Sequence, residues 1–184
     1  MRCRAFKWIL SIACVIAVAV LPVAGRAQSR DWRGRIDRLV ETADSLSMRS
    51  QLTFYLNKFA ENDRPVRETW HYTTNRGSVV IFEVHYFVDT LERMEVYYLD
   101  KEQVVCMEEY EILWPLHAED RILWGTVCFF DAQQVRQYIS MGKRAGNEAL
   151  PIVDPYLRFR RRFKELNETR TLLEKDNRYV TFAR

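Results

Sequence analysis

The 184-residue sequence lacks the short motifs that mark common hydrolases, nucleotide-binding enzymes and zinc peptidases. It has no serine nucleophile elbow, no glycine-rich phosphate loop and no HExxH helix. Histidine is scarce, with His71, His85 and His117 the only three, and a protein zinc site needs three or four converging ligands. The sequence therefore indicates no catalytic, cofactor-binding or metal-binding residue, and it leaves the activity open.

Acidic residues are absent from the first 27 positions, which carry four basic ones. The basic start is followed by an uncharged run at 9–24, ILSIACVIAVAVLPVA, and by small residues at Gly25 and Ala27. This pattern predicts a secretory signal peptide, residues 1–27, cleaved after Ala27. The run is slightly shorter than the roughly 17–25 residues of a membrane span. We therefore expect a periplasmic or secreted protein, with an uncleaved N-terminal membrane anchor as the alternative.

Beyond residue 27 the charge is nearly balanced. Four of the 28 basic residues and none of the 25 acidic ones lie in 1–27, so 28–184 carries 24 against 25, a net charge of −1. The basic isoelectric point of the whole sequence, about 8.7, thus does not indicate nucleic-acid binding, and no aromatic–basic RNA motif is present. Residues 28–184 have the length of a single domain with one core.

Hydrophobic periodicity predicts an α+β fold for this domain. Residues 31–46 place apolar side chains at helical spacing, and from about 64 to 141 the period changes to two, which predicts an antiparallel meander of about six strands. A second amphipathic helix is expected at 154–174, opened by an aspartate cap and a proline. Residues 50–61 fit either a short helix or a strand. The apolar strand faces should pack on the helices.

One phrase occurs twice in the meander, as EVYYLDKEQVV at 95–105 and TVCFFDAQQVR at 126–136. Asp100 and Asp131 each follow an aromatic strand end, as Asp89 does, and aspartate favours the first position of a type I turn. We interpret the phrase as strand, aspartate-led turn and strand. These aspartates are therefore predicted to form hairpin corners and not a catalytic site.

The repeated phrase resembles the hairpins of an uncharacterised group of bacterial exported proteins, which have the form aromatic-aromatic-x-Asp-x-Gly-Lys-Leu-Ile. The resemblance covers roughly residues 64–141. This chain departs from that form at the turn glycines, near which it has Glu102 and Gln133. The resemblance implies a hairpin fold and export, and it implies no activity because none is known for the group.

Cys106 and Cys128 remain in the predicted mature chain, which is bound for a compartment where disulfides persist. If Trp114 lies opposite Arg121 across the hairpin loop, the same register brings the two cysteines nearly opposite each other. They are therefore disulfide candidates. Two buried thiols are the alternative, because a shift of one residue would place them on opposite faces.

The turn at 75–77, NRG, predicts a second register. It places His85 opposite Glu68 and His71 opposite Phe82, so the two histidines are not expected to form a pair. No metal site is predicted on this ground.

Charge is segregated along the chain. Residues 83–120 hold eleven acidic residues against two basic ones, whereas 136–184 hold twelve basic against six acidic. The first interpretation is two solvated faces of opposite sign that attract when the last helix docks. The alternative is contact with an anionic partner or a membrane surface through the basic side chains of that helix, Arg158, Arg160, Arg161, Arg162 and Lys164.

By elimination, we expect an exported non-catalytic binding or structural module. Its partner would be an exported or envelope protein. The first alternative is a carrier that holds an apolar or lipid-like ligand in a curved aromatic sheet. The second is an enzyme of unrecognised type.

Overall fold

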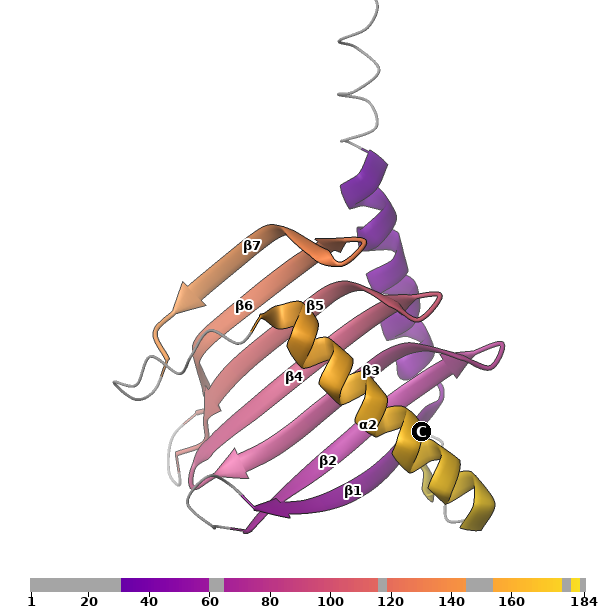
Figure 1. The fold of residues 1–184 in the computed structure, drawn as a ribbon. Helices are drawn as coiled ribbons and strands as arrows, with labels where there is room; N and C mark the ends of the chain where they lie inside the picture. Colours follow the sequence, from indigo (N-terminus) through magenta and orange to yellow (C-terminus); the bar gives the residue numbers. More distant parts are fainter. Residues whose placement is uncertain (1–30, 60–64, 116–118, 145–153, 177–179, 183–184) are drawn as a thin grey trace, which may run out of the picture. The chain divides into compact units, whose positions relative to one another are not determined.

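The computed structural model describes five stretches of the chain: 31–59, 65–115, 119–144, 154–176 and 180–182 (Figure 1). The predicted signal peptide and its cleavage site at Ala27 lie outside them. The chain divides into two compact units, Met1–Arg38 and Leu39–Arg184. Within the described residues, none of the helices is both long and apolar enough to cross a membrane.

The predicted N-terminal helix is confirmed. In the first unit residues 31–38 are helical, and the helix continues through residue 47 in the second. The helix ends in a turn, where the Ser50 amide donates to the Leu46 carbonyl over 3.0 Å.

The second unit is built on one antiparallel sheet whose first seven strands follow chain order, as a meander does (Figure 1). A short eighth strand pairs with β1, so the order across the sheet is β7-β6-β5-β4-β3-β2-β1-β8. The predicted fold class is therefore confirmed. The strands are β1 Gln51–Phe59, β2 Pro65–Asn75, β3 Ser78–Val88, β4 Leu91–Asp100, β5 Gln103–Leu113, β6 Arg121–Asp131, β7 Gln134–Gly142 and β8 Val180–Phe182.

The ambiguous residues 50–61 supply the strand β1. Their apolar side chains Leu52, Phe54 and Leu56 alternate along the chain and all join the same core cluster. This period of two is the strand pattern, and pairing with β2 stabilises it.

The predicted second helix is confirmed as α2, Pro155–Asp176, which crosses one face of the sheet (Figure 1). The Asp154 carboxylate accepts a hydrogen bond of 2.8 Å from the Tyr156 amide, so it caps the first turn. Phe159 and Leu166 are buried against the sheet.

Aromatic rings fill the layer between α2 and the sheet. Across β1 to β4, Phe54 stacks on Trp70, Trp70 on Phe82 and Phe82 on Tyr97, with centroid distances of 5.6, 6.2 and 4.5 Å. Phe159 of α2 lies 6.0 Å from Tyr97 and 6.5 Å from Phe82. Each ring buries a large apolar area, so this stack is the main core of the unit.

The hairpin corners lie where the aspartates predict them, but the turn type differs. In the β4–β5 turn, Lys101 and Glu102 have φ of 51° and 66°, whereas the other two aspartate-led corners have positive φ at their first central residue alone, Asp89 at 57° and Ala132 at 56°. Positive φ at both central residues is the requirement of a type I′ turn, whose twist matches that of paired strands. The β4–β5 turn meets this requirement. Type I needs negative φ at both central residues, so the predicted type I geometry is wrong at all three aspartate-led corners.

The register that made Cys106 and Cys128 disulfide candidates is wrong as well. Arg121 pairs with Leu113 and not with Trp114, and a bulge between Glu111 and Ile112 then shifts the β5–β6 register. Cys106 consequently pairs with Phe129, and Cys128 pairs with Met107.

Successive residues of a strand point to opposite faces, so this shift separates the two thiols. Cys128 joins the core beneath α2, whereas Cys106 pairs with Tyr98 on the other side of the sheet. Both cysteines are buried, and no disulfide joins them.

Candidate functional site

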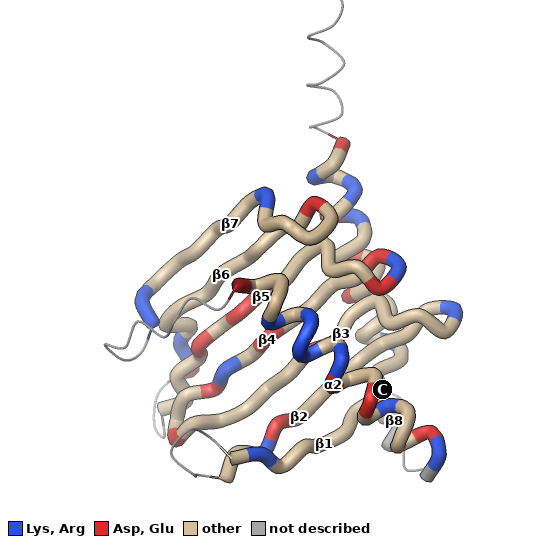
Figure 2. The backbone as a smooth tube through the Cα atoms, in the orientation of Figure 1, with Lys and Arg blue, Asp and Glu red and all other residues tan. Residues whose placement is uncertain are grey.

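The basic residues predicted to contact an anionic partner do not form one surface. Arg158 and Arg162 point inward from α2, and Arg160, Arg161 and Lys164 are exposed. Figure 2 shows the basic positions of α2 lying over acidic positions of the sheet. The attraction between oppositely charged segments is thus realised as buried ion pairs between helix and strands.

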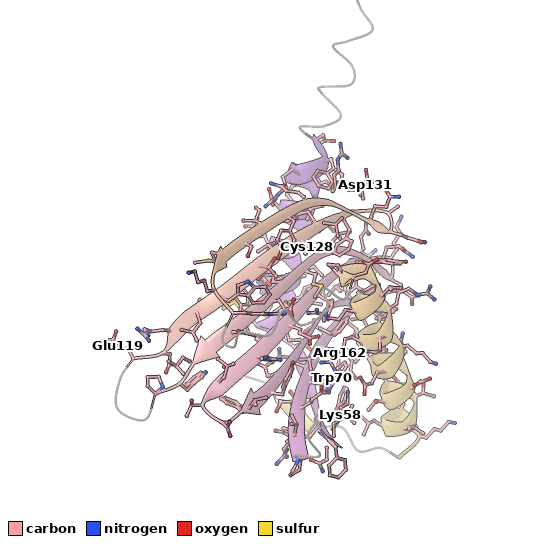
Figure 3. All side chains as sticks on the ribbon, turned by 60° about the vertical axis from the view of Figure 1, so that its left-hand side comes forward. Lys58, Trp70, Glu119, Cys128, Asp131 and Arg162 are labelled. Carbon is pink, nitrogen blue, oxygen red and sulfur yellow. The ribbon has the colours of Figure 1, made fainter. Side chains whose placement is uncertain are left out.

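Arg162 is the centre of these pairs. Its Nε and Nη2 donate to the two carboxylate oxygens of Glu95 over 2.9 Å each, and its Nη1 donates to Glu68 over 2.9 Å. The guanidinium also lies 5.5 Å from the centroid of the Trp70 ring, an arrangement visible in Figure 3. Burial alone would lower the pKa of Arg162, but the attraction of Glu95 outweighs it and raises that pKa. Burial alone would raise the pKa of Glu95, but the charge of Arg162 outweighs it and lowers that pKa.

The ion pairs continue on both sides of Arg162. Lys58 of β1 bridges Glu68 and Glu165 with contacts of 2.7 and 2.5 Å. On the other side Arg158 pairs with Glu109, which also accepts a hydrogen bond of 2.9 Å from Arg144. Because Arg158 and Arg162 are already paired with protein carboxylates, this layer is a structural network and not an anion-binding site.

The opposite face of the sheet brings His71 and His85 together, contrary to the prediction. A bulge between Thr73 and Thr74 shifts the β2–β3 register, so His71 pairs with Glu83, and His85 pairs with Thr69 instead of Glu68. The two imidazole rings lie 5.5 Å apart, edge to face.

His85 lies between two carboxylates. Its Nδ1 is 2.9 Å from Glu92, its Nε2 is 3.1 Å from Glu83, and Glu92 also accepts a hydrogen bond of 2.8 Å from Trp114. Burial alone would lower the pKa of His85, but these two carboxylates raise it. Burial lowers the pKa of His71, and the neighbouring His85 lowers it further.

Two further carboxylates lie near this pair. Burial raises the pKa of Asp44 and of Glu108, and the charge of Glu83 adds to both shifts. Each accepts a hydrogen bond from a tyrosine, Asp44 from Tyr98 and Glu108 from Tyr110. Within the described residues, no three His, Cys, Asp or Glu side chains are arranged to hold a metal ion. Both nitrogens of His85 are engaged by carboxylates, and His71 Nδ1 lies 2.8 Å from the hydroxyl of Thr53.

The third feature is the edge strand β7. In the part of the chain that the structure describes, β7 pairs with β6 alone, whereas at the opposite side β1 is covered by β8. All nine β7 residues are exposed. They include four large apolar side chains, with exposed fractions of 37% for Val135, 56% for Tyr138, 47% for Ile139 and 61% for Met141.

Both faces of β7 carry apolar groups. Tyr138 pairs with Cys128 and so lies on the α2 side, whereas Ile139 and Met141 pair with Val127 and Gly125 and lie on the other. Edge strands of soluble proteins usually carry charged residues, prolines or bulges that hinder further pairing, and β7 has one bulge, where its ladder with β6 skips Arg136. β7 carries one charged residue, Arg136, whose Nη1 donates to Asp131 over 2.9 Å.

Sequence reasoning identified this segment as a strand but not as the edge. The signal was present in QVRQYISMG, an apolar strand with a single charge. Its place at the edge follows only from the sheet order.

Comparison with known proteins adds no relative from which a function could be transferred. No family model matches the chain, and neither a curated protein nor a solved structure does.

Proposed function

We propose that this protein is an exported, non-catalytic binding module that pairs its β7 edge with an extended polypeptide segment. The observation that carries the proposal is the exposure of β7, an apolar strand with one pairing edge and few charges. An extended peptide adds to such an edge by main-chain hydrogen bonds, and alternate side chains give specificity.

The side chains of β7 suit this mode of binding. An added strand would place its own side chains beside Tyr138 on one face and beside Ile139 and Met141 on the other. Contact with either set would remove apolar area from water, which favours association.

The layer between α2 and the sheet speaks against the carrier and enzyme alternatives. A lipid-like ligand would need this space, which the stacked rings of Trp70, Phe82 and Phe159 and the paired Arg162 occupy. On the other face, His85 is held by Glu83 and Glu92. Both ring nitrogens of His85 are thus occupied by protein carboxylates, which weighs against a catalytic role for that side chain.

Export is supported by the basic and apolar segment at 1–24 and by the small residues before Gln28. The resemblance to exported hairpin proteins agrees with it. N-terminal sequencing of protein recovered outside the cytoplasm should begin at Gln28. Recovery from the cytoplasm with an intact N-terminus would overturn this part of the proposal.

The binding surface is tested by photo-crosslinking in the cell that produces the protein. A crosslinking phenylalanine analogue replaces Tyr138, and in a matched control it replaces Leu172, an apolar residue of α2 with a similar exposed fraction of 63%. We expect one defined polypeptide, identified by mass spectrometry, to be crosslinked at position 138 and not at 172. No product at 138, or the same products at both positions, would refute binding at β7.

A further inference from the structure

We infer that the segment bound at β7 is the β7 strand of a second copy of this chain, antiparallel to the first and related to it by a two-fold axis. This inference rests on the proposed strand pairing at β7 and names the partner. Two-fold homodimers are the commonest assemblies of soluble proteins, and their interfaces must be self-complementary.

The geometry of an antiparallel edge meets this requirement. A two-fold axis perpendicular to the sheet keeps the same face of both copies upward, so each residue pairs with one from the same face of its partner. Tyr138 would therefore meet the α2-side set of the partner strand. Val127 and Gly125, the partners of Ile139 and Met141 in the chain, place those two side chains together on the other face. With the two-fold axis at Tyr138, the middle of β7, Ile139 would lie opposite Gln137 of the partner strand and diagonally beside its Ile139.

Charge is complementary along the edge as well. At one end of the hairpin Asp131 is the last residue of β6 and pairs with Gln134 of β7, and at the other end Lys143 follows β7 with an exposed side chain. Figure 3 shows Asp131 at the tip of this hairpin. Antiparallel pairing about the middle of β7 sets each Asp131 end beside the Lys143 end of the other copy.

The middle of the strand presents little repulsion. Arg136 is the one charged residue of β7, and it is 2.9 Å from the Asp131 carboxylate of its own hairpin. Like charges placed directly opposite destabilise a strand pair. The Arg136 side chains of the two copies lie directly opposite each other in only one register of the antiparallel pair. The other registers avoid this repulsion.

The first test measures mass in solution. Protein expressed from residues 1–184 is studied by sedimentation equilibrium across the micromolar range, and we expect a monomer–dimer equilibrium. Ile139→Lys should raise the dissociation constant at least about tenfold, because two lysines would lie on one face of the interface. Leu172→Lys makes the same exchange on exposed α2 and should leave the dissociation constant unchanged.

A charge exchange then tests the antiparallel orientation. Asp131→Lys alone and Lys143→Asp alone should each weaken the dimer, because each places like charges at both ends of the interface. The double variant restores opposite charges and should recover most of the lost affinity. If the substitutions act only within their own hairpin, the double variant should not recover affinity. The reason is that Asp131→Lys removes the hydrogen-bond partner of Arg136 in the single variant and in the double variant alike. Thermal unfolding of each variant shows that it is folded.

The outcomes separate this inference from the proposed function. A dimer that Ile139→Lys dissociates and the double exchange restores supports the inference. A monomer at all concentrations, together with a different polypeptide crosslinked at position 138, overturns the inference and leaves the binding function standing. A monomer with no crosslink at 138 overturns both. A dimer that neither substitution affects places the interface elsewhere and overturns the inference.

Discussion

Arg162 of α2 binds Glu95 of β4 through two hydrogen bonds of 2.9 Å each, beneath a helix that covers both residues. A paired arginine and carboxylate in this fork geometry fix both distance and orientation. Moving α2 along the sheet would separate two buried charges, so the pair defines where the helix docks. Desolvation of the two charges offsets much of their attraction. The main effect of the Arg162–Glu95 pair is therefore to fix the position of α2 on the sheet, and not to add much stability.

Removing one member of this pair should be costly. We expect Arg162→Ala to lower the free energy of unfolding by about 3–5 kcal/mol, because Glu95 and Glu68 would remain buried without their guanidinium. Arg161→Ala, one residue earlier on the exposed side of α2, should change it by less than about 0.5 kcal/mol. Urea unfolding of the two variants measures the difference. Similar losses in both would contradict the assignment of Arg162 to the core.

The two histidines should respond to pH with opposite signs. The pKa of His85 is raised in the folded state, so its stabilising effect is present below the ordinary value of 6.5 and is lost as the pH rises through the higher folded value. His85→Gln should therefore cost more free energy of unfolding at pH 6 than at pH 9.

The pKa of His71 is lowered on folding, which makes the folded state less stable as the pH falls from 6.5 toward the lower folded value. His71→Gln removes this loss, so its stability relative to the wild type should improve as the pH decreases. Urea midpoints across this range measure both variants. If the two substitutions show the same pH trend, the His85–carboxylate pairing is wrong.

Cys106 and Cys128 should both react with a thiol reagent in denaturant without any reductant, because no disulfide joins them. In the folded protein both should react slowly, since both are buried and burial raises the pKa of Cys128 to about 11. Mass spectrometry of the peptides that contain each cysteine counts the labels. An unlabelled pair that becomes reactive only after reduction would show that a disulfide forms in the native compartment.

Gly142 ends β7 at a point that a side chain cannot occupy. Its φ is +75°, and a Cβ added there would lie 2.0 Å from the carbonyl oxygen of Leu123. Gly77 has a similar φ of +85° but has no atom within 4 Å of an added Cβ. Gly77→Ala should therefore cost about 1 kcal/mol for its backbone conformation alone.

Gly142→Ala adds the steric conflict with Leu123 and should cost clearly more. Thermal or urea unfolding of the two single variants isolates this difference. Equal losses at both glycines would mean that the end of β7 relaxes around the added methyl group.

Much of the fold was predictable because alternation is a local property. Phe82 and Val84 lie on the apolar side of their strand in the sequence, and both are fully buried beneath α2. The helix at Pro155–Asp176 likewise followed from a capping aspartate, a proline and an apolar stripe. Each of these signals depends on neighbours within a few residues.

The pairings that matter for the candidate sites were not predictable in this way. Bulges after Thr73 and Glu111 each insert one residue into a ladder, and nothing in the local sequence identifies them. The first brings His71 beside His85, and the second separates Cys106 from Cys128. A shift of one residue exchanges the two faces of a strand. A one-residue error in register therefore leaves the fold prediction intact but reverses the predicted placement of the two histidines and of the two cysteines.

The amino-acid order alone thus determined a helix, a meander of alternating strands and a second basic helix, since periodicity and capping are encoded over short spans. Tertiary structure decided which side chains meet: it paired Arg162 with Glu95, brought the histidines together and left β7 at an edge. The physical reason is that strand register and sheet order depend on contacts between distant segments, and these form only when the whole domain packs.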